Sequence, residues 1–211
     1  MRLLIILLTI FLLTSCCCNY DEKDFDFTAT HNKLLHPYTK GDTLYFSDKT
    51  GNFDTITISN VDTLQQCGCL MVGNRKSIAV EIKHLPLNRW SSGTEMGDGK
   101  TPPKVLDQNL IVIEKTLHDK NEEYFIGINY RDFMGELTDL TKMNTDHHFE
   151  ELGVKNYWTI INESADWEQH KQNATIITRL FWTEKYGLTG YELRNGQTFS
   201  LIQKHLKTAF K

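Results

Sequence analysis

The sequence predicts a mainly β domain, an antiparallel meander that forms a curled sheet, half-barrel or sandwich with one or two short helices. Two observations carry this prediction. Runs rich in threonine, aromatic and β-branched residues recur along the chain, and some alternate between polar and apolar side chains. Turn-forming residues separate these runs, among them Asp48–Asn52 and the pair Asn195-Gly196.

Some nine or ten short runs have strand composition. They cover 42–47, 53–59, 62–72, 77–83, 109–115, 124–131, 157–162, 174–183, 188–193 and 198–203. The run at 53–59 has the clearest period of two, because threonines alternate with isoleucines. Asn195-Gly196 predicts a tight hairpin between the last two runs, since a type I′ turn requires positive φ at both central residues.

Two stretches predict short helices. Apolar residues recur at helical spacing across 133–140, and Phe149 with Leu152 is followed by Gly153, a residue that commonly ends a helix. Residues 86–104 predict a long loop, and long loops in compact domains are often functional. The four tryptophans are expected either in the core or on a surface that binds a glycan or a protein.

The first sixteen residues carry a separate signal. Arg2 precedes an apolar core, Leu3–Leu13, which runs into Thr14-Ser15-Cys16. A positive residue, an apolar core and small residues before a cut point form the layout of a secretory signal. As a helix the core is roughly 16 Å long at about 1.5 Å per residue, well short of a hydrocarbon thickness of about 30 Å. We therefore predict a signal peptide over 1–15.

Leu13-Thr-Ser-Cys16 resembles the lipobox of bacterial lipoprotein precursors, in which the cysteine carries diacylglycerol and becomes the new N-terminus. The resemblance implies lipidation of Cys16 and attachment to a membrane of the cell envelope, with the outer membrane expected. Several acyl chains make a stable anchor at about 0.8 kcal/mol per buried CH₂. The alternatives are a plain signal peptide or an uncleaved anchor. Residues 181–199 are also similar to the closing β-meander of envelope lipoproteins.

Residues 16–28 predict an acidic tether, and residues 29–211 a single β-rich domain. The chain has 23 Lys and Arg against 27 Asp and Glu, a formal net charge of −4. The chain has no excess of basic residues, so its composition indicates neither a nucleic-acid partner nor a polybasic segment that binds lipid. An acidic run after the lipidated cysteine resembles an export signal of some Gram-negative bacteria, so the periplasmic and surface faces both stay open.

Cys67-Gly68-Cys69 is a cysteine pair away from the anchor. Residues i and i+2 of a strand lie about 6.5–7 Å apart, too far for an unstrained disulfide. A bridge therefore needs a turn or bulge at Gly68, which glycine permits. The other interpretations are two buried thiols, a redox-labile bridge or a soft-metal pair, and a metal site needs more ligands.

His147, His148 and Glu150 form a weak candidate site. On a helix His147 and Glu150 share a face, which suits a metal or an acid/base pair. The sequence has no His-Glu-x-x-His motif, so a solvated helix start is favoured, and neither a metal nor a catalytic residue is assigned.

Several aspartates lie in short phrases with two interpretations. Asp48, Asn52 and Asp54 surround Gly51 and could hold calcium, but a hairpin turn fits the spacing better. Three phrases of the form Asp-Thr-apolar, at 42–44, 54–56 and 62–64, resemble the acceptor sequence for periplasmic O-glycosylation in one bacterial phylum. The alternative is strand residues after a turn-forming aspartate.

These observations favour a lipid-anchored envelope protein whose β-rich domain has a non-enzymatic binding or structural role. A protein or a glycan is the expected partner besides the membrane, and no cofactor is assigned. The alternative is an envelope hydrolase whose site is assembled from distant residues, with His147, His148 and the 86–104 loop as candidates.

Overall fold

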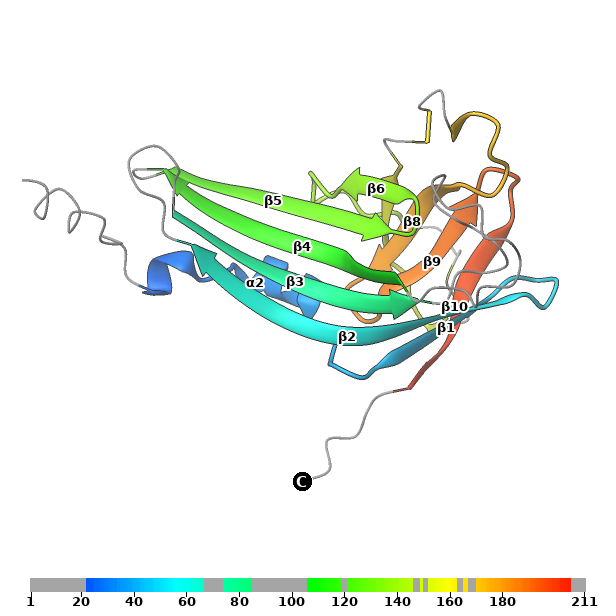
Figure 1. The fold of residues 1–211 in the computed structure, drawn as a ribbon, viewed down its shortest axis with the longest axis horizontal. Helices are drawn as coiled ribbons and strands as arrows, with labels where there is room; N and C mark the ends of the chain where they lie inside the picture. The colour runs from blue at the N-terminus through cyan, green and yellow to red at the C-terminus, as the bar shows by residue number, and fades with distance from the viewer. Residues whose placement is uncertain are drawn as a thin grey trace, which may run out of the picture.

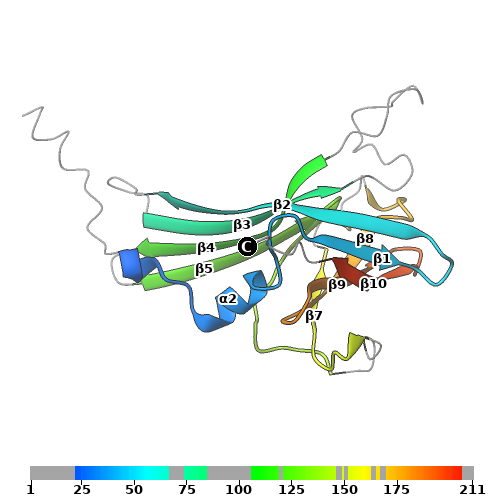
Figure 2. The same ribbon diagram turned by 90° about the horizontal axis from the view of Figure 1, so that it is seen from below.

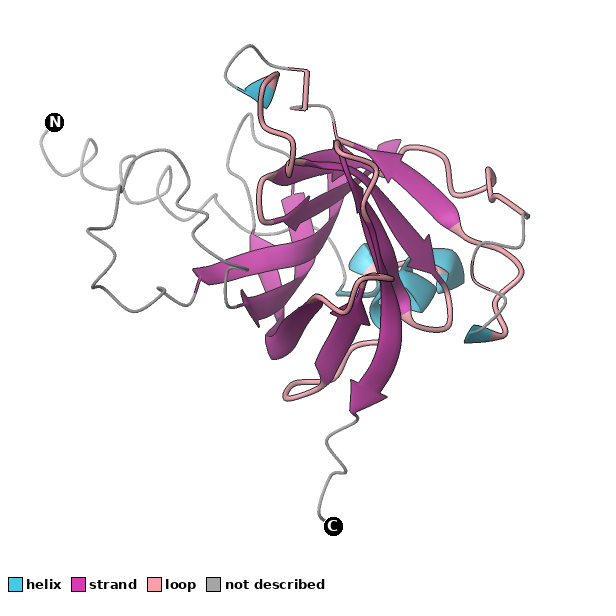
Figure 3. Ribbon diagram, turned by 90° about the vertical axis from the view of Figure 1, so that its right-hand side faces the viewer, coloured by secondary structure: helices cyan, strands magenta, loops and turns pink. Residues whose placement is uncertain are grey.

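The computed structural model describes residues 22–66, 74–84, 106–118, 121–145, 149, 152–162, 165–166 and 170–205. Within them, ten strands form one antiparallel sheet in the order β6-β5-β4-β3-β2-β1-β10-β9-β8-β7. Sequential strands pair as a meander, and β1 pairs with β10. The sheet curls until β6 and β7 approach each other, which gives a nearly closed barrel (Figures 1 and 3). The predicted curled, mainly β meander is confirmed.

The elements have the following bounds. The strands are β1 Thr43–Ser47, β2 Phe53–Gln66, β3 Asn74–His84, β4 Leu106–His118, β5 Asn121–Tyr130, β6 Phe133–Glu136, β7 Trp158–Ile161, β8 Ile177–Thr183, β9 Gly187–Leu193 and β10 Thr198–His205. Two helical segments precede them, η1 Glu22–Phe25 and α2 Ala29–Leu35. The run expected at 62–72 is, in its described part, the continuation of β2. Neither η1 nor α2 is long and apolar enough to cross a membrane.

Strands β2 to β5 are long, and α2 covers one face of them (Figure 2). The Thr28 side chain caps this helix by accepting a hydrogen bond from the His31 N–H. His31, Leu34 and Leu35 are buried, and the His31 ring stacks on Tyr124 of β5 with 4.2 Å between ring centroids. The helix therefore seals the apolar face that β2–β5 would otherwise expose.

In its described part, the stretch expected as an acidic tether over 16–28 contributes two buried side chains to the domain. Phe25 is completely buried and Phe27 is 8% exposed. The Lys115 ammonium on β4 also donates to the Asp26 carbonyl at 3.3 Å. Two phenylalanines among the acidic residues supply apolar surface, so packing against the domain begins by Phe25.

The prediction of a helix at 133–140 is wrong. Phe133 and Gly135 are buried while Met134 and Glu136 are exposed, and this period of two belongs to strand β6. The helix expected at 149–152 lies partly outside the described residues. Gly153, which is described, has φ 65°, a conformation common at the end of a helical turn.

The predicted hairpins are confirmed, with one difference in turn type. Gly51 in the β1–β2 turn has φ 87°. In the β9–β10 turn Gly196 has φ 84°, but Asn195 does not have positive φ. The Gly196 N–H donates to the Leu193 carbonyl, and the Leu193 N–H donates to Gln197. The connection is therefore a three-residue loop that ends in a left-handed glycine, not a type I′ turn.

The barrel interior is filled by large side chains. Those that are almost completely buried include Trp158, Trp182, Tyr130, Tyr191, Phe46 and Phe133. Two of the four tryptophans are thus core residues, while Trp90 and Trp167 lie outside the described residues. These buried side chains belong to one large hydrophobic core cluster of the described residues.

Asn162 and Gly135 bring β6 and β7 together where no strand ladder joins them. The Met134 N–H of β6 donates to the Asn162 side chain at 3.3 Å, and the same side chain donates to the Ile177 carbonyl at 2.6 Å. A Cβ at Gly135 would lie 2.7 Å from the Ile161 carbonyl oxygen. The close approach of the two strands therefore needs glycine at this position.

Candidate binding groove

A polar groove of about 530 Å³ lies on strands β2, β3 and β4. Four of its lining residues carry an amide or a hydroxyl group, namely Ser59, Asn60, Gln108 and Asn109. The other three are charged, namely Lys40, Glu81 and Lys83. None of these lining residues is aromatic or aliphatic. The groove therefore offers many hydrogen-bond donors and acceptors and little apolar surface.

The groove lies on the outer face of the sheet. Val80 and Ile82 are completely buried, whereas Glu81 between them is half-buried and Lys83 is exposed. Because successive side chains of a strand point to opposite faces, Glu81 and Lys83 point away from the core. Lys40, from the connection between α2 and β1, lies at the side of the groove.

Two β-bulges build this surface. The register between β2 and β3 shifts between Ile58 and Asn60, and the register between β3 and β4 shifts between Val80 and Glu81. A bulge adds an unpaired residue, bends the strand and redirects nearby side chains. Both shifts occur at one level of the sheet.

Glu81 is paired with Asn60 on one side and with Asn109 on the other. Directly opposite residues have Cβ atoms about 4.5–5.5 Å apart. An amide, a carboxylate and a second amide therefore form a short row across three strands. This row is the centre of the candidate site.

Gln108 connects the groove with the barrel interior. Its side chain donates to the Arg131 carbonyl at 3.1 Å and accepts the Arg131 N–H at 2.8 Å. Arg131 follows β5 and has φ 59°, a region that side-chain-bearing residues seldom adopt. Its guanidinium lies 3.9 Å from the Asp54 carboxylate in the core. The floor of the groove thus rests on a buried charged cluster.

Asp54 is the centre of this buried cluster and is 3% exposed. One of its carboxylate oxygens accepts hydrogen bonds from the Tyr130 hydroxyl and, at 2.7 Å, from the Tyr191 hydroxyl. Burial raises the pKa of both phenols, and the negative charge of Asp54 raises it further. Both tyrosines therefore stay protonated and donate. The cluster joins β2, β5 and β9 across the barrel.

The calcium interpretation of Asp48, Asn52 and Asp54 does not fit this geometry, because Asp54 points into the core. The Asp48 carboxylate accepts hydrogen bonds from Thr50, Asn52 and Gln197. Desolvation opposes ionisation of Asp48, but these hydrogen bonds lower its pKa overall. In the described part of the chain, no group of three or more His, Cys, Asp or Glu residues is placed to hold a metal.

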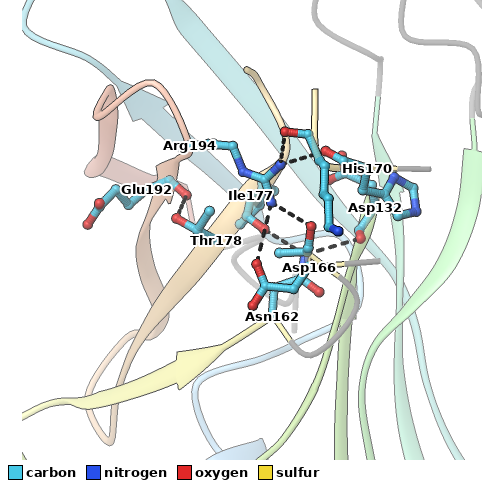
Figure 4. Close-up of polar contacts among 10 residues, drawn as sticks. Asp132, Asn162, Asp166, His170, Ile177, Thr178, Glu192 and Arg194 are labelled. Carbon is cyan, nitrogen blue, oxygen red and sulfur yellow. Dashed lines mark hydrogen bonds and ion pairs between the residues drawn. The ribbon is translucent and has the colours of Figure 1, made fainter. Parts of the chain in front are cut away.

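A second polar cluster lies at the end of the barrel where β6 meets β7 (Figure 4). The Arg194 guanidinium donates to the carbonyls of His170 and Lys171 at 2.6 Å. Burial raises the pKa of Asp132, and electrostatic interaction with Arg131 acts in the opposite direction. The Arg194 hydrogen bonds hold the backbone at His170 and Lys171, and the Asp132 carboxylate lies near the His170 imidazole.

The other residues singled out in the sequence fall in two groups. Those outside the described residues are Cys16, Cys67, Cys69, His147, His148 and Glu150. The threonines of the three Asp-Thr-apolar phrases lie on strands. Thr43 and Thr55 are half-buried, whereas Thr63 is exposed. O-glycosylation of these threonines stays a prediction.

Sequence reasoning did not find the groove, although β2 contains one signal of it. Ile58 is completely buried and Val61 continues the same face, so Ser59-Asn60 interrupts the period of two with an extra polar residue. That interruption is the local mark of a bulge. No family model, curated protein or solved structure was found to match the chain.

Proposed function

We propose that this protein is a lipid-anchored component of the bacterial cell envelope, attached through diacylglycerol on Cys16, with a non-enzymatic binding domain. The anchor rests on the lipobox-like Leu13-Thr-Ser-Cys16. The observation that carries the binding role is the outward row of Asn60, Glu81 and Asn109. This row lies on the outer face of strands whose inner face belongs to the hydrophobic core, and residues held in regular strands lose little conformational entropy on binding.

The geometry also supports an orientation of the groove. Glu22 follows Cys16 by six positions, which span at most roughly 20 Å at about 3.5 Å per residue. Figure 1 shows η1 beside the end of the long strands where β3 begins. Glu81 lies seven residues further along β3 than Asn74, roughly 23 Å at about 3.3 Å per residue. A lipid on Cys16 would therefore lie nearer to this end of the long strands than to the groove.

Anchoring is tested by expressing the full chain with its signal in a Gram-negative host. We expect the wild-type protein to incorporate a palmitate analogue and to partition into detergent. The Cys16→Ser variant should do neither, and Cys17→Ser should behave like the wild type. A wild-type protein with the mass of the unmodified polypeptide would contradict the anchor.

An envelope hydrolase is the second candidate, and one observation favours it. Asp132 in the β5–β6 turn lies near His170, which follows β7. A carboxylate that orients an imidazole is a common arrangement for a general base. Turnover of a p-nitrophenyl ester that is lost in both Asp132→Asn and His170→Gln, but kept in the surface variant Arg179→Gln, would support an enzyme. Turnover that persists in both variants, or none in the wild type, would remove this candidate.

A further inference from the structure

The groove has a chemistry that matches a hydroxyl-rich ligand. Its central row offers two amides and a carboxylate, and Ser59 adds a hydroxyl. Amides donate and accept at adjacent atoms, and a carboxylate accepts from two hydroxyls at once. Sugars present such hydroxyl pairs along their length. The volume of about 530 Å³ falls within the range of about 300–1,000 Å³ that is typical of small-ligand sites.

The same lining disfavours other classes of ligand. Drug-like and lipid ligands need predominantly apolar walls, whereas no aromatic or aliphatic residue lines this groove. Protein interfaces depend on buried aromatic or arginine anchors at their centre, and neither residue type lines the groove. A ligand that binds through many hydrogen bonds fits better.

The charges of the groove differ in sign from those of the whole chain. Lys40 and Lys83 flank Glu81, so two cations and one carboxylate leave the lining with a net charge of +1, although the chain carries −4. A local positive charge on an acidic protein favours an anionic group at this position. The two lysines lie on different elements, the connection before β1 and strand β3, and so could contact successive units of one ligand.

We infer that the groove binds an acidic oligosaccharide, a chain of sugars that carries carboxylates. The Asn60–Glu81–Asn109 row hydrogen-bonds the sugar hydroxyls, and Lys40 and Lys83 pair with the carboxylates. This inference deepens the proposed binding function. It depends on the lipid anchor only for the cellular location of binding. If the Cys16 experiment fails, the anchor is wrong and the groove can still be tested independently.

Isothermal titration of the full mature chain, in nonionic detergent, tests the inference. The probes are tetragalacturonate, its neutral counterpart with the same linkage, and monomeric galacturonate. We expect tetragalacturonate to bind at least about tenfold more tightly than either of the others. Its affinity should fall as salt rises, because the contribution of exposed charges is screened.

Variants assign the binding to the groove. Lys40→Gln and Lys83→Gln should each lower the affinity for tetragalacturonate about three- to tenfold. The weak affinity for the neutral tetrasaccharide should stay unchanged. Asn60→Ala and Asn109→Ala should lower the affinity for both the acidic and the neutral tetrasaccharide. Lys49→Gln, an exposed lysine in the β1–β2 turn, is the matched control and should have no effect. Circular dichroism confirms that each variant is folded.

Four outcomes would overturn the inference. The first is no binding of any probe, and the second is equal affinity for the acidic and neutral tetrasaccharides. The third is equal affinity for the acidic monomer and tetramer, which would indicate a simple anion site. The fourth is an affinity that none of the four groove variants changes.

Discussion

The side-chain amide of Gln108 holds both the N–H and the carbonyl of Arg131. The Arg131 N–H donates to it at 2.8 Å, and the amide donates to the Arg131 carbonyl at 3.1 Å. Arg131 has φ 59°, where an L-residue is strained. The two hydrogen bonds help to keep it there, with its guanidinium toward Asp54. One glutamine thus links the outer groove with the buried cluster.

Replacing Gln108 tests this link. Gln108→Ala leaves two backbone groups of Arg131 without their partner, so we expect the free energy of unfolding to fall by about 1–3 kcal/mol. Urea unfolding followed by circular dichroism measures the change. Asn109→Ala, at the exposed neighbouring position, should change the value by less than about 0.5 kcal/mol. Equal losses in the two variants would contradict the role of Gln108.

Asp54→Asn tests the buried cluster. The variant keeps the shape of the side chain but removes the carboxylate charge that pairs with Arg131 and accepts hydrogen bonds from two tyrosine hydroxyls. Removing one partner of a buried ion pair costs about 3–5 kcal/mol, and we expect a loss in this range. Asp62→Asn, an exposed position on the same strand, is the control. A midpoint in urea that is unchanged in Asp54→Asn would show that the cluster does not stabilise the barrel.

Gly135→Ala tests how the barrel closes. A Cβ at this position meets the Ile161 backbone oxygen at 2.7 Å, and a backbone atom cannot move without shifting β7. We expect a loss of about 1–3 kcal/mol in thermal or urea unfolding. In the control, Gly127→Ala, the nearest atoms belong to the Phe125 ring, which is 44% exposed and able to rotate away. If Gly127→Ala lowers the free energy of unfolding by more than Gly135→Ala does, the close approach of β6 and β7 does not make glycine necessary at position 135.

His31 predicts a dependence of stability on pH. Burial lowers the pKa of His31 in the folded protein, and the nearby Lys115 cation lowers it further. In the unfolded chain the imidazole has its ordinary pKa of about 6.5. Just below that pH the unfolded state binds a proton that the folded state does not. Stability should therefore decrease as the pH falls below about 6.5.

The measurement is the free energy of unfolding between pH 5 and 8. Glu122 and Tyr124 also face His31 and Lys115, so His31→Phe isolates the imidazole while it keeps a ring to stack on Tyr124. We expect a shallower decline below pH 6.5 in this variant. His36→Gln, at an exposed position, should retain the wild-type slope. A wild-type slope in His31→Phe would assign the pH dependence to other groups.

Local pattern was sufficient for much of the sheet. The alternation in β2 and the glycines in the turns after Ser47 and Leu193 depend on residues close in the chain. At 133–140 the same kind of pattern was misleading. Phe133, Leu137 and Leu140 satisfy a helical spacing, yet pairing of β6 with β5 imposes a strand. Tertiary pairing overrides a weak local preference in such short segments.

The candidate site could not be derived in the same way. Ser59-Asn60 marks a bulge locally, but only the register of three strands places Asn60 and Asn109 on either side of Glu81. Likewise, Asp54 belongs by sequence to a turn-forming phrase, and only the curling of the sheet brings Tyr191 to it. These partners are distant in the chain, so no local period encodes their contact.

The sequence alone thus established a β-rich chain with hairpins and predicted a lipid anchor at Cys16, because hydrophobic period, turn chemistry and the lipobox-like motif are properties of neighbouring residues. Tertiary structure decided that β1 pairs with β10, that Asp54 lies inside the barrel, and that two bulges coincide to form an outer groove. These features depend on strand register and closure. Both arise from contacts between segments that the linear order of residues leaves far apart.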